Sequence, residues 1–251
     1  MIRKLKIIVE YEGTAYQGWQ VQPAGPTIQG WLQNTLTRIT GEKAAVVGSG
    51  RTDSGVHAEA QVAHFRTASK MTPRQFLMAF NSLLPRDIVV TRVEEPETDF
   101  HAQMSATGKI YRYTVLNRAH PSALHFRRST FMQYPLDVEA MSRAGAALVG
   151  EHDFSAFRAG NCEAKSPVRK IVRVDILREG EFIKMYFEGN GFLKHMVRNL
   201  VGTLLLVGRG KMPPEEVERI LASRDRRQAG PTAPPQGLTL VKVFYPGDSH
   251  P

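Results

Sequence analysis

Hydrophobic and polar residues follow two distinct periods along the first part of the chain. Residues 5–11 alternate apolar and polar side chains, which predicts a β-strand. Residues 27–40 carry apolar side chains at helical spacing until Gly41, which predicts a helix. Further elements are expected here, namely strands at 44–47, 61–65 and 88–93 and a helix opened by the capping-box pattern Thr72-Pro73-Arg74-Gln75.

The second part of the chain mixes the same two periods. Residues 109–116 place Tyr111, Tyr113 and Val115 on one face of a predicted strand. Strands at 170–177 and 182–187 are separated by Arg178-Glu179-Gly180-Glu181, a pattern typical of a hairpin. Also expected are helices around 138–149, over 193–207 and from Pro213-Pro214-Glu215-Glu216 on, then a surface loop over 222–236 and a last strand over 238–244.

Strands that alternate with helices but are joined by hairpins favour mixed, largely antiparallel sheets over a doubly wound parallel sheet. We therefore predict an α+β protein of two α/β halves, with sheets flanked by helices and an active-site cleft between the halves. Residues 94–106 lack clear periodicity. The halves are accordingly predicted as residues 1–105 and 106–251.

The chain is basic, since its 251 residues include 33 Lys and Arg against 24 acidic residues, a formal charge of +9. Such a charge favours a polyanionic partner, because a protein that neutralises nucleic-acid phosphates releases their counterions. A basic surface without any such partner has the same composition. Charge alone therefore does not decide between the two interpretations.

The number of cysteines and the hydropathy of the chain indicate the cellular compartment of the protein. Cys162 is the single cysteine, which excludes an intramolecular disulfide and a cysteine-based zinc cluster and suits a reducing cytoplasm. Residues 1–10 have the alternation of a strand instead of the pattern of a signal peptide. The most apolar stretch, 200–207, is far shorter than the ~20 residues of a membrane span. We expect a soluble, cytoplasmic protein without membrane attachment.

The candidate chemistry lies in a glycine-rich loop between two predicted strands, Gly48-Ser49-Gly50-Arg51-Thr52-Asp53-Ser54-Gly55. Its glycines permit positive φ angles and close approach by a ligand. The loop lacks the Gly-Lys-Ser/Thr of a phosphate loop, the third glycine of a dinucleotide fingerprint and the glycine that precedes a nucleophile-elbow serine. Asp53 and His57 lack the further ligands of a metal site. Asp53 is thus either a functional carboxylate or the cap of a turn.

The stretch 50–58 resembles the signature of the tRNA pseudouridine synthase A family, which more often has Ala where this chain has Ser54. Both residues are small, so the difference is compatible with the family. Other stretches agree with the family in the same order, namely residues 11–20, Asp99-Phe100-His101-Ala102, Ser105-Ala106-Thr107 with Tyr111-Arg112-Tyr113, His152-Asp153-Phe154 with Phe157-Arg158, Met196-Val197-Arg198-Asn199 with Val201-Gly202, and Gly237-Leu238. The resemblance covers the chain from the first strand to the last.

The resemblance implies a base-flipping isomerase that converts uridines 38, 39 and 40 of the tRNA anticodon arm to pseudouridine without cofactor or metal. Asp53 would be the catalytic carboxylate, attacking uracil C6 or ribose C1′, and Arg198 the cation paired with it. Tyr111 would stack on the uracil and Arg51 would steer the flipped base or fill its place. His57 is a candidate for RNA contact or for a structural role. The family is homodimeric, so a homodimer on tRNA is expected.

The residue types and their spacing also allow a purely structural interpretation of these residues. A helix arginine such as Arg198 is commonly a solvated surface residue, and strand tyrosines commonly pack in the core, which we expect of Tyr113. Arg224, Arg226 and Arg227 are candidates for phosphate contacts or simply a charged surface. Two alternative functions remain, a non-catalytic module that binds structured RNA and a pseudouridine synthase that acts on other uridines.

Overall fold

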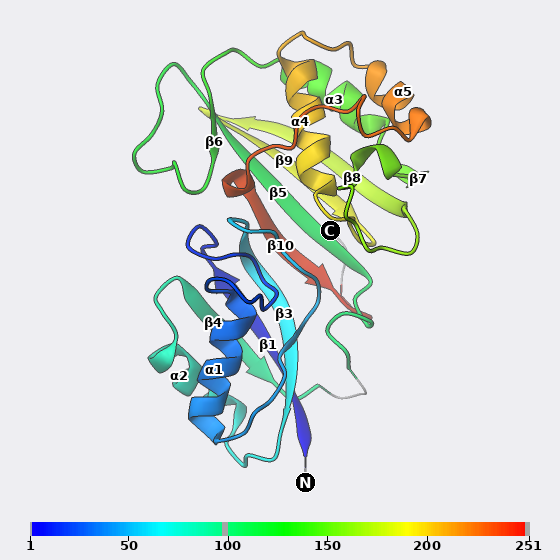
Figure 1. The fold of residues 1–251 in the computed structure, drawn as a ribbon. Coiled ribbons are helices and arrows are strands. Elements are labelled where there is room, and N and C mark those ends of the chain that lie inside the picture. The colour runs from blue at the N-terminus through cyan, green and yellow to red at the C-terminus, as the bar shows by residue number, and fades with distance from the viewer. Residues whose placement is uncertain (1, 97–99, 249–251) are drawn as a thin grey trace. The chain divides into compact units, whose positions relative to one another are not determined.

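The computed structural model describes residues 2–96 and 100–248. The chain divides into two compact units (Figure 1). The described residues of the first unit are 2–96, 100–107 and 240–248, and those of the second are Gly108–Thr239. The sequence interpretation had placed everything after residue 105 in the second half. Among the described residues, the structure groups 240–248 with the first unit.

The first unit is built on the strands β1 (Arg3–Tyr11), β2 (Val47–Gly48), β3 (His57–Thr67), β4 (Ile88–Glu94) and most of β10 (Leu238–Phe244). Of these, β1–β3, β1–β4 and β2–β3 pair antiparallel. In the sheet they lie in the order β4-β1-β3-β10, and β2 pairs with β3. In β1, Leu5, Ile7 and Val9 are fully buried, as the alternation predicted.

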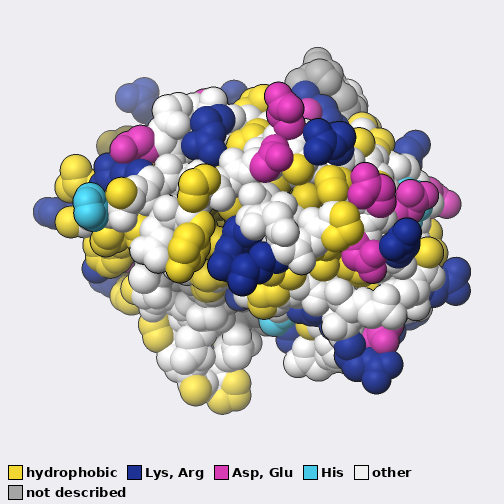
Figure 2. Space-filling model, turned by 90° about the horizontal axis from the view of Figure 1, so that it is seen from above, with side chains coloured by type: hydrophobic (Ala, Val, Ile, Leu, Met, Phe, Trp, Pro, Cys, Tyr) yellow, Lys and Arg dark blue, Asp and Glu magenta, His cyan; other side chains and the backbone are white. Residues whose placement is uncertain are grey.

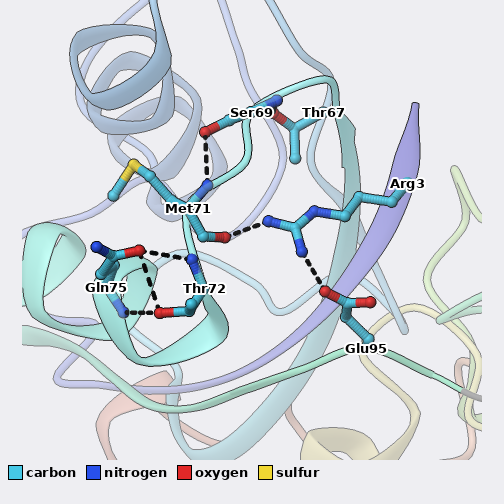
Figure 3. A network of polar contacts seen from close by, with 7 residues as sticks. All are labelled: Arg3, Thr67, Ser69, Met71, Thr72, Gln75 and Glu95. Carbon is cyan, nitrogen blue, oxygen red and sulfur yellow. Dashed lines mark hydrogen bonds and ion pairs between the residues drawn. The ribbon is translucent and has the colours of Figure 1, made fainter. Parts of the chain in front are cut away.

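Two helices, α1 (Ile28–Thr40) and α2 (Pro73–Leu83), accompany this sheet. The predicted capping box of α2 is confirmed, because Thr72 Oγ1 accepts from the Gln75 amide while the Gln75 side chain accepts from the Thr72 amide (Figure 3). Arg3 of β1 binds the Met71 carbonyl just before this cap. The start of α2 is therefore tied to the first strand of the sheet.

The second unit contains the strands β5 (Gly108–Asn117), β6 (Thr130–Met132), β7 (Gly150–Asp153), β8 (Val168–Glu179) and β9 (Phe182–Gly189). The order is β5-β9-β8-β7, all antiparallel, with β6 parallel to β5. Its helices are α3 (Val138–Ala146), α4 (Met196–Gly208) and α5 (Glu216–Ser223), with single turns η1 (Ser155–Phe157) and η2 (Pro235–Gly237).

The core of the second unit lies between its sheet and the helices (Figure 1). Gly145 of α3 brings the helix close to Val174 of β8, whose Cγ1 would lie 3.0 Å from an added Cβ. On the neighbouring strands Tyr113, Met185 and Phe187 are fully buried. The α+β class and the largely antiparallel pairing are thus confirmed.

Two predicted boundaries are wrong for identifiable reasons. The strand expected at 44–47 is only β2, because Gln29 and Gln33 of α1 bind the backbone of Val46 in place of a partner strand, with Gln29 Nε2 2.8 Å from the Val46 oxygen. The helix expected up to residue 149 ends at Ala146, after which a tight turn leads to Gly150 at φ +120°. The short strands β6 and β7 were not predicted. No helix in the described ranges is long and apolar enough to cross a bilayer.

Candidate active site

Asp53 lies in the loop between β2 and β3 of the first unit. Its carbonyl oxygen accepts a hydrogen bond from the Val56 amide at 3.1 Å, which closes a four-residue turn. Gly55 occupies the third position of the turn at φ +76°, a left-handed conformation that favours glycine. The Asp53 side chain is half-buried and Arg51 is exposed. The loop therefore presents a carboxylate from a backbone held in one conformation.

Residues 12–19, which follow β1, pack along the Asp53 loop. The Trp19 amide donates to the Thr52 carbonyl at 3.1 Å, and the Gly55 amide donates to the Tyr16 carbonyl at 3.3 Å. The loop is thus bound by main-chain groups on both sides of Asp53. This places two of the stretches named in the sequence, 11–20 and 50–58, against each other.

Two glycines make this contact possible. A Cβ at Gly13 would lie 2.0 Å from the Val56 carbonyl oxygen, and one at Gly18 would lie 2.5 Å from the Thr52 carbonyl oxygen. Gly18 also has φ +85°. Backbone therefore packs directly on backbone at both positions, which leaves no space for a side chain and restricts movement of Asp53.

Buried side chains support the loop from the sheet. The Tyr11 hydroxyl lies 2.8 Å from Thr52 Oγ1, and the Trp19 ring, 2% exposed, lies 6.2 Å from the Tyr11 ring. Burial raises the pKa of Tyr11 to about 12, although its hydrogen bonds to Thr52 and Gln61 oppose the shift. Tyr11 is therefore a neutral hydroxyl at physiological pH and serves as a hydrogen-bonding anchor for the residue before Asp53.

His57 begins β3 and is buried. Its Nδ1 accepts a hydrogen bond from the Gly13 amide at 2.9 Å, so the neutral ring carries its proton on Nε2. Glu12 Oε1 lies 3.3 Å from the same Nδ1, a contact that becomes an ion pair only when the ring is protonated. These contacts support a role for His57 in joining the two segments, and its contact with RNA stays a prediction. Among the described residues, no three His, Cys, Asp or Glu side chains are grouped to hold a metal ion.

Tyr111 lies on β5 of the second unit and is 8% exposed. Its ring packs edge-on against Phe192, with centroids 5.2 Å apart and planes at 86°. Phe192 follows β9, whose Phe187 is the register partner of Tyr111. The tyrosine ring is therefore oriented by an aromatic neighbour as well as by its strand.

Tyr113 lies on the same face of β5 as Tyr111 and is packed in the core, as the sequence predicted. Its ring is fully buried, and its hydroxyl lies 2.6 Å from Thr130 Oγ1 and 2.8 Å from the Pro234 carbonyl oxygen. Burial raises the pKa of Tyr113 to about 12, against smaller opposing effects of the Thr130 hydrogen bond and the Arg198 charge. Arg198 is thus close enough to Tyr113 to act on it electrostatically.

Lys109 was not singled out in the sequence, although it lies two residues before Tyr111 and thus on the same face of β5. Burial lowers the pKa of Lys109 to about 8, so a fraction of this amine is neutral near physiological pH. The alternation of β5 in the sequence could have identified Lys109, because it places this lysine on the face of Tyr111, Tyr113 and Val115. A cation on an otherwise apolar strand face is unusual.

Arg198 is the third residue of α4. Its Nε donates to the Ala233 carbonyl at 2.8 Å, and its own carbonyl accepts from the Ala233 amide at 3.0 Å. The interpretation of Arg198 as a freely solvated helix arginine is therefore wrong. His195 occupies the N-cap position of α4 at φ +61°, a left-handed conformation that is uncommon for a non-glycine residue.

The family stretch around Asp153 packs into the second unit. Phe154 and Phe157 are fully buried, and Asp153 accepts from the Ser155 amide at 2.9 Å and pairs with Arg224 at 3.3 Å. Burial raises the pKa of Asp153, but Ser155 and Arg224 with Arg158 outweigh it, and the net shift is downward. Asp99 lies outside the described residues.

Basic residues do not by themselves mark a binding face. On the face drawn in Figure 2, Lys and Arg side chains are interspersed with acidic and hydrophobic ones. Of the candidate phosphate contacts, Arg227 is exposed but binds Asp225 through both carboxylate oxygens, and Arg226 is turned inward to Asn199.

Comparison with known proteins gives full-length matches. The sequence model of a family described as tRNA pseudouridine synthase matches residues 7–104 and 144–246. The tRNA pseudouridine synthase A of Geobacter sp. (strain M21) is 49% identical over 246 residues, which is 98% of this chain and 100% of that protein. The one of Myxococcus xanthus is 49% identical over 245 residues, 96% of this chain and 92% of that protein. The tRNA pseudouridine synthase A 2 of Clostridium perfringens is 47% identical over 244 residues, 97% of this chain and 100% of that protein. The matched ranges of the family model contain Asp53 and Arg198, whereas Tyr111 lies between them.

Proposed function

Because the chain belongs to the tRNA pseudouridine synthase family, a family of isomerases, we propose that it converts uridine to pseudouridine in tRNA. We further propose that the target uridines are those at positions 38, 39 and 40 of the anticodon arm, as the resemblance of its motifs implies. The observation that carries the proposal is the Asp53 loop, a half-buried carboxylate on a turn that main-chain hydrogen bonds and glycine contacts hold in place.

The proposed reaction exchanges one glycosidic bond for another. The bond between ribose C1′ and uracil N1 breaks, the ring turns, and a bond forms between C1′ and C5. The proton lost from C5 is balanced by one gained at N1. The formal oxidation of C5 and the formal reduction of C1′ cancel within the molecule, and no group is transferred to another molecule, so the reaction requires neither a redox cofactor nor an energy source.

Asp53 is proposed as the nucleophile, attacking uracil C6 or ribose C1′. A carboxylate must be ionised to act in this way, and a site that excludes water opposes ionisation unless a cation compensates. We assign that cation to Arg198, whose guanidinium is held at Nε by the Ala233 carbonyl. A guanidinium fixed at one nitrogen keeps its other donors in a defined direction, which suits a paired carboxylate.

Tyr111 is proposed to stack on the uracil and to take part in the removal of the C5 proton. Its ring is held edge-on by Phe192 and lies on the same strand face as Lys109. A flat aromatic surface with a fixed orientation is what a base that must turn in place requires, because stacking tolerates rotation in the plane of the ring.

Arg51 is proposed to assist base flipping. A uridine within a stem cannot reach a carboxylate in a loop, so the nucleotide must leave the stack at a cost of a few kcal/mol. Arg51 is exposed two residues before Asp53. Its planar guanidinium can stack in the vacated space or steer the extruded base. We further propose a cytoplasmic homodimer in which each bound tRNA spans both subunits.

We predict that Arg51→Ala slows conversion of an intact anticodon stem-loop about tenfold more than conversion of a stem-loop with a mismatch at the target uridine. The mismatch supplies part of the unpairing energy in advance, so it should partly rescue the variant. Single-turnover rates on the two RNAs measure the difference. Equal losses on both RNAs would remove base extrusion from the roles of Arg51.

The function itself is tested by mapping pseudouridine in unmodified tRNA before and after incubation with the purified protein. We expect new pseudouridine at positions 38 to 40 and unchanged yield in the presence of a chelator. Binding without any new pseudouridine would favour the alternative of a non-catalytic RNA-binding module. Pseudouridine at other positions would favour a synthase with a different target.

A further inference from the structure

The segment from Ala229 to Gly237 connects two elements of the second unit that carry proposed site residues. Toward α4, the Ala233 amide and carbonyl bind the carbonyl and Nε of Arg198 at 3.0 and 2.8 Å, and the Gly230 amide donates to Thr203 Oγ1 at 2.9 Å. The segment therefore follows the first two turns of the helix that carries Arg198.

The same segment also contacts β5, the strand that carries Tyr111. The Pro234 carbonyl accepts from the Tyr113 hydroxyl at 2.8 Å. A Cβ at Gly237 would lie 2.6 Å from the Tyr113 ring and 3.0 Å from the Thr114 carbonyl oxygen. The position of this one segment therefore links the Arg198 helix to the Tyr111 strand.

Three side chains, Asn199, Arg226 and Thr232, hold the segment; we call them the Asn199 hub. Asn199 is 1% exposed, and its Oδ1 accepts from Thr232 Oγ1 at 2.6 Å and from Arg226 Nη2 at 3.1 Å. Arg226 also donates to Thr232 Oγ1 at 3.3 Å and to the Ala229 carbonyl at 3.2 Å. The Asn199 Nδ2 donates to the Phe157 carbonyl at 2.8 Å, which fixes the orientation of the amide.

We propose that the Asn199 hub is a positioning device that sets the Arg198 guanidinium through the Ala229–Gly237 segment. Thr232 is next to Ala233, whose carbonyl holds Arg198 Nε, so a shift of the segment at Thr232 is passed to the guanidinium directly. The proposal rests on the proposed function, in which Arg198 supports the ionised Asp53. It also assigns Arg226, a candidate phosphate contact in the sequence, to the interior.

The pair of variants Thr232→Val, which is isosteric, and Thr232→Ser, which keeps the hydroxyl, tests the proposal. Valine removes the hydroxyl from two hydrogen bonds while keeping the volume, whereas serine keeps the hydroxyl. We expect Thr232→Val to lower kcat for tRNA about tenfold with KM within about twofold of wild type, and Thr232→Ser to stay within about twofold in both.

Thr67→Val is the matched control. Thr67 is buried in the first unit, donates to Glu42 Oε2 at 2.9 Å and accepts from the Ser69 amide at 3.0 Å, so the same change removes the same number of hydrogen bonds elsewhere. We expect it to cost stability and leave kcat unchanged. Should Thr232→Val not fold, Arg226→Met serves instead: a fall in kcat supports the hub, and a rise in KM alone indicates phosphate binding and contradicts it.

A double-mutant cycle separates positioning from general stability. Arg198→Lys removes the guanidinium Nε that binds Ala233, so Thr232→Val should lower kcat by less than twofold in that background. Equal effects of Thr232→Val in both backgrounds, or a kcat equal to wild type in the single variant, would overturn the proposal. A wild-type protein that makes no pseudouridine would instead overturn the proposed function, on which the hub depends.

Discussion

Asp53→Asn is expected to reduce pseudouridine formation by at least about 10⁴-fold, because an amide cannot ionise and so cannot serve as the proposed carboxylate nucleophile. The turn that holds Asp53 uses its backbone carbonyl and the main chain of residues 12–19, and the substitution leaves these contacts in place. The variant should therefore fold and bind tRNA as the wild type does. Single-turnover assays and a binding titration on the same tRNA measure the two properties separately.

Asp137→Asn is the matched control for this prediction. Asp137 caps α3 through its side chain, which accepts from the Ala140 amide at 2.9 Å. Asparagine caps helices as well as aspartate does, so we expect this variant to keep wild-type turnover and stability. If Asp53→Asn retained substantial activity while Asp137→Asn behaved as wild type, the nucleophile would have to be another residue.

Local structure was predictable because its causes lie close together in the sequence. The capping box at Thr72 and Gln75 joins residues three apart. The hairpin of β8 and β9 was expected to turn at residues 178–181, and it turns within that range at Gly180 and Glu181, because Arg178 and Glu179 still pair with β9. Such contacts need only the local pattern and the turn chemistry. Errors fell where a tertiary contact competes with the pattern, as when Gln29 and Gln33 bind the backbone of Val46.

The family resemblance identified the candidate site residues, whereas only the structure showed which residues contact them. Spacing does not reveal that Tyr16 binds the Asp53 loop, because Ser54 lies 38 residues further along the chain. The Asn199 hub joins residues up to 33 positions apart, and each member is an ordinary polar residue in the sequence. Sequence reasoning therefore names the chemical groups, whereas the contacts that orient them depend on long-range packing.

Gly202→Ala is expected to lower the free energy of unfolding by about 3 kcal/mol. In a helix interior this change normally stabilises by up to about 1 kcal/mol, because alanine has the higher helix propensity. At Gly202, however, an added Cβ would lie 1.7 Å from the Pro231 carbonyl oxygen and 2.9 Å from its carbon. The Pro231 backbone cannot change rotamer as a side chain can. The steric overlap therefore outweighs the gain in helix propensity.

Gly208→Ala, in the same helix, separates these two effects. A Cβ there would lie 2.5 Å from Met141 Sδ, the end of a flexible side chain that can repack. We expect the free energy of unfolding of Gly208→Ala to stay within about 1 kcal/mol of wild type.

Urea unfolding of both variants gives the comparison, with a lower midpoint and an unchanged slope expected for Gly202→Ala. Because the clash pushes residues 230–233 away from α4, Gly202→Ala should also lose turnover at temperatures where it remains folded. Wild-type stability in Gly202→Ala would show that this segment moves freely, and would remove the physical basis for its control of Arg198.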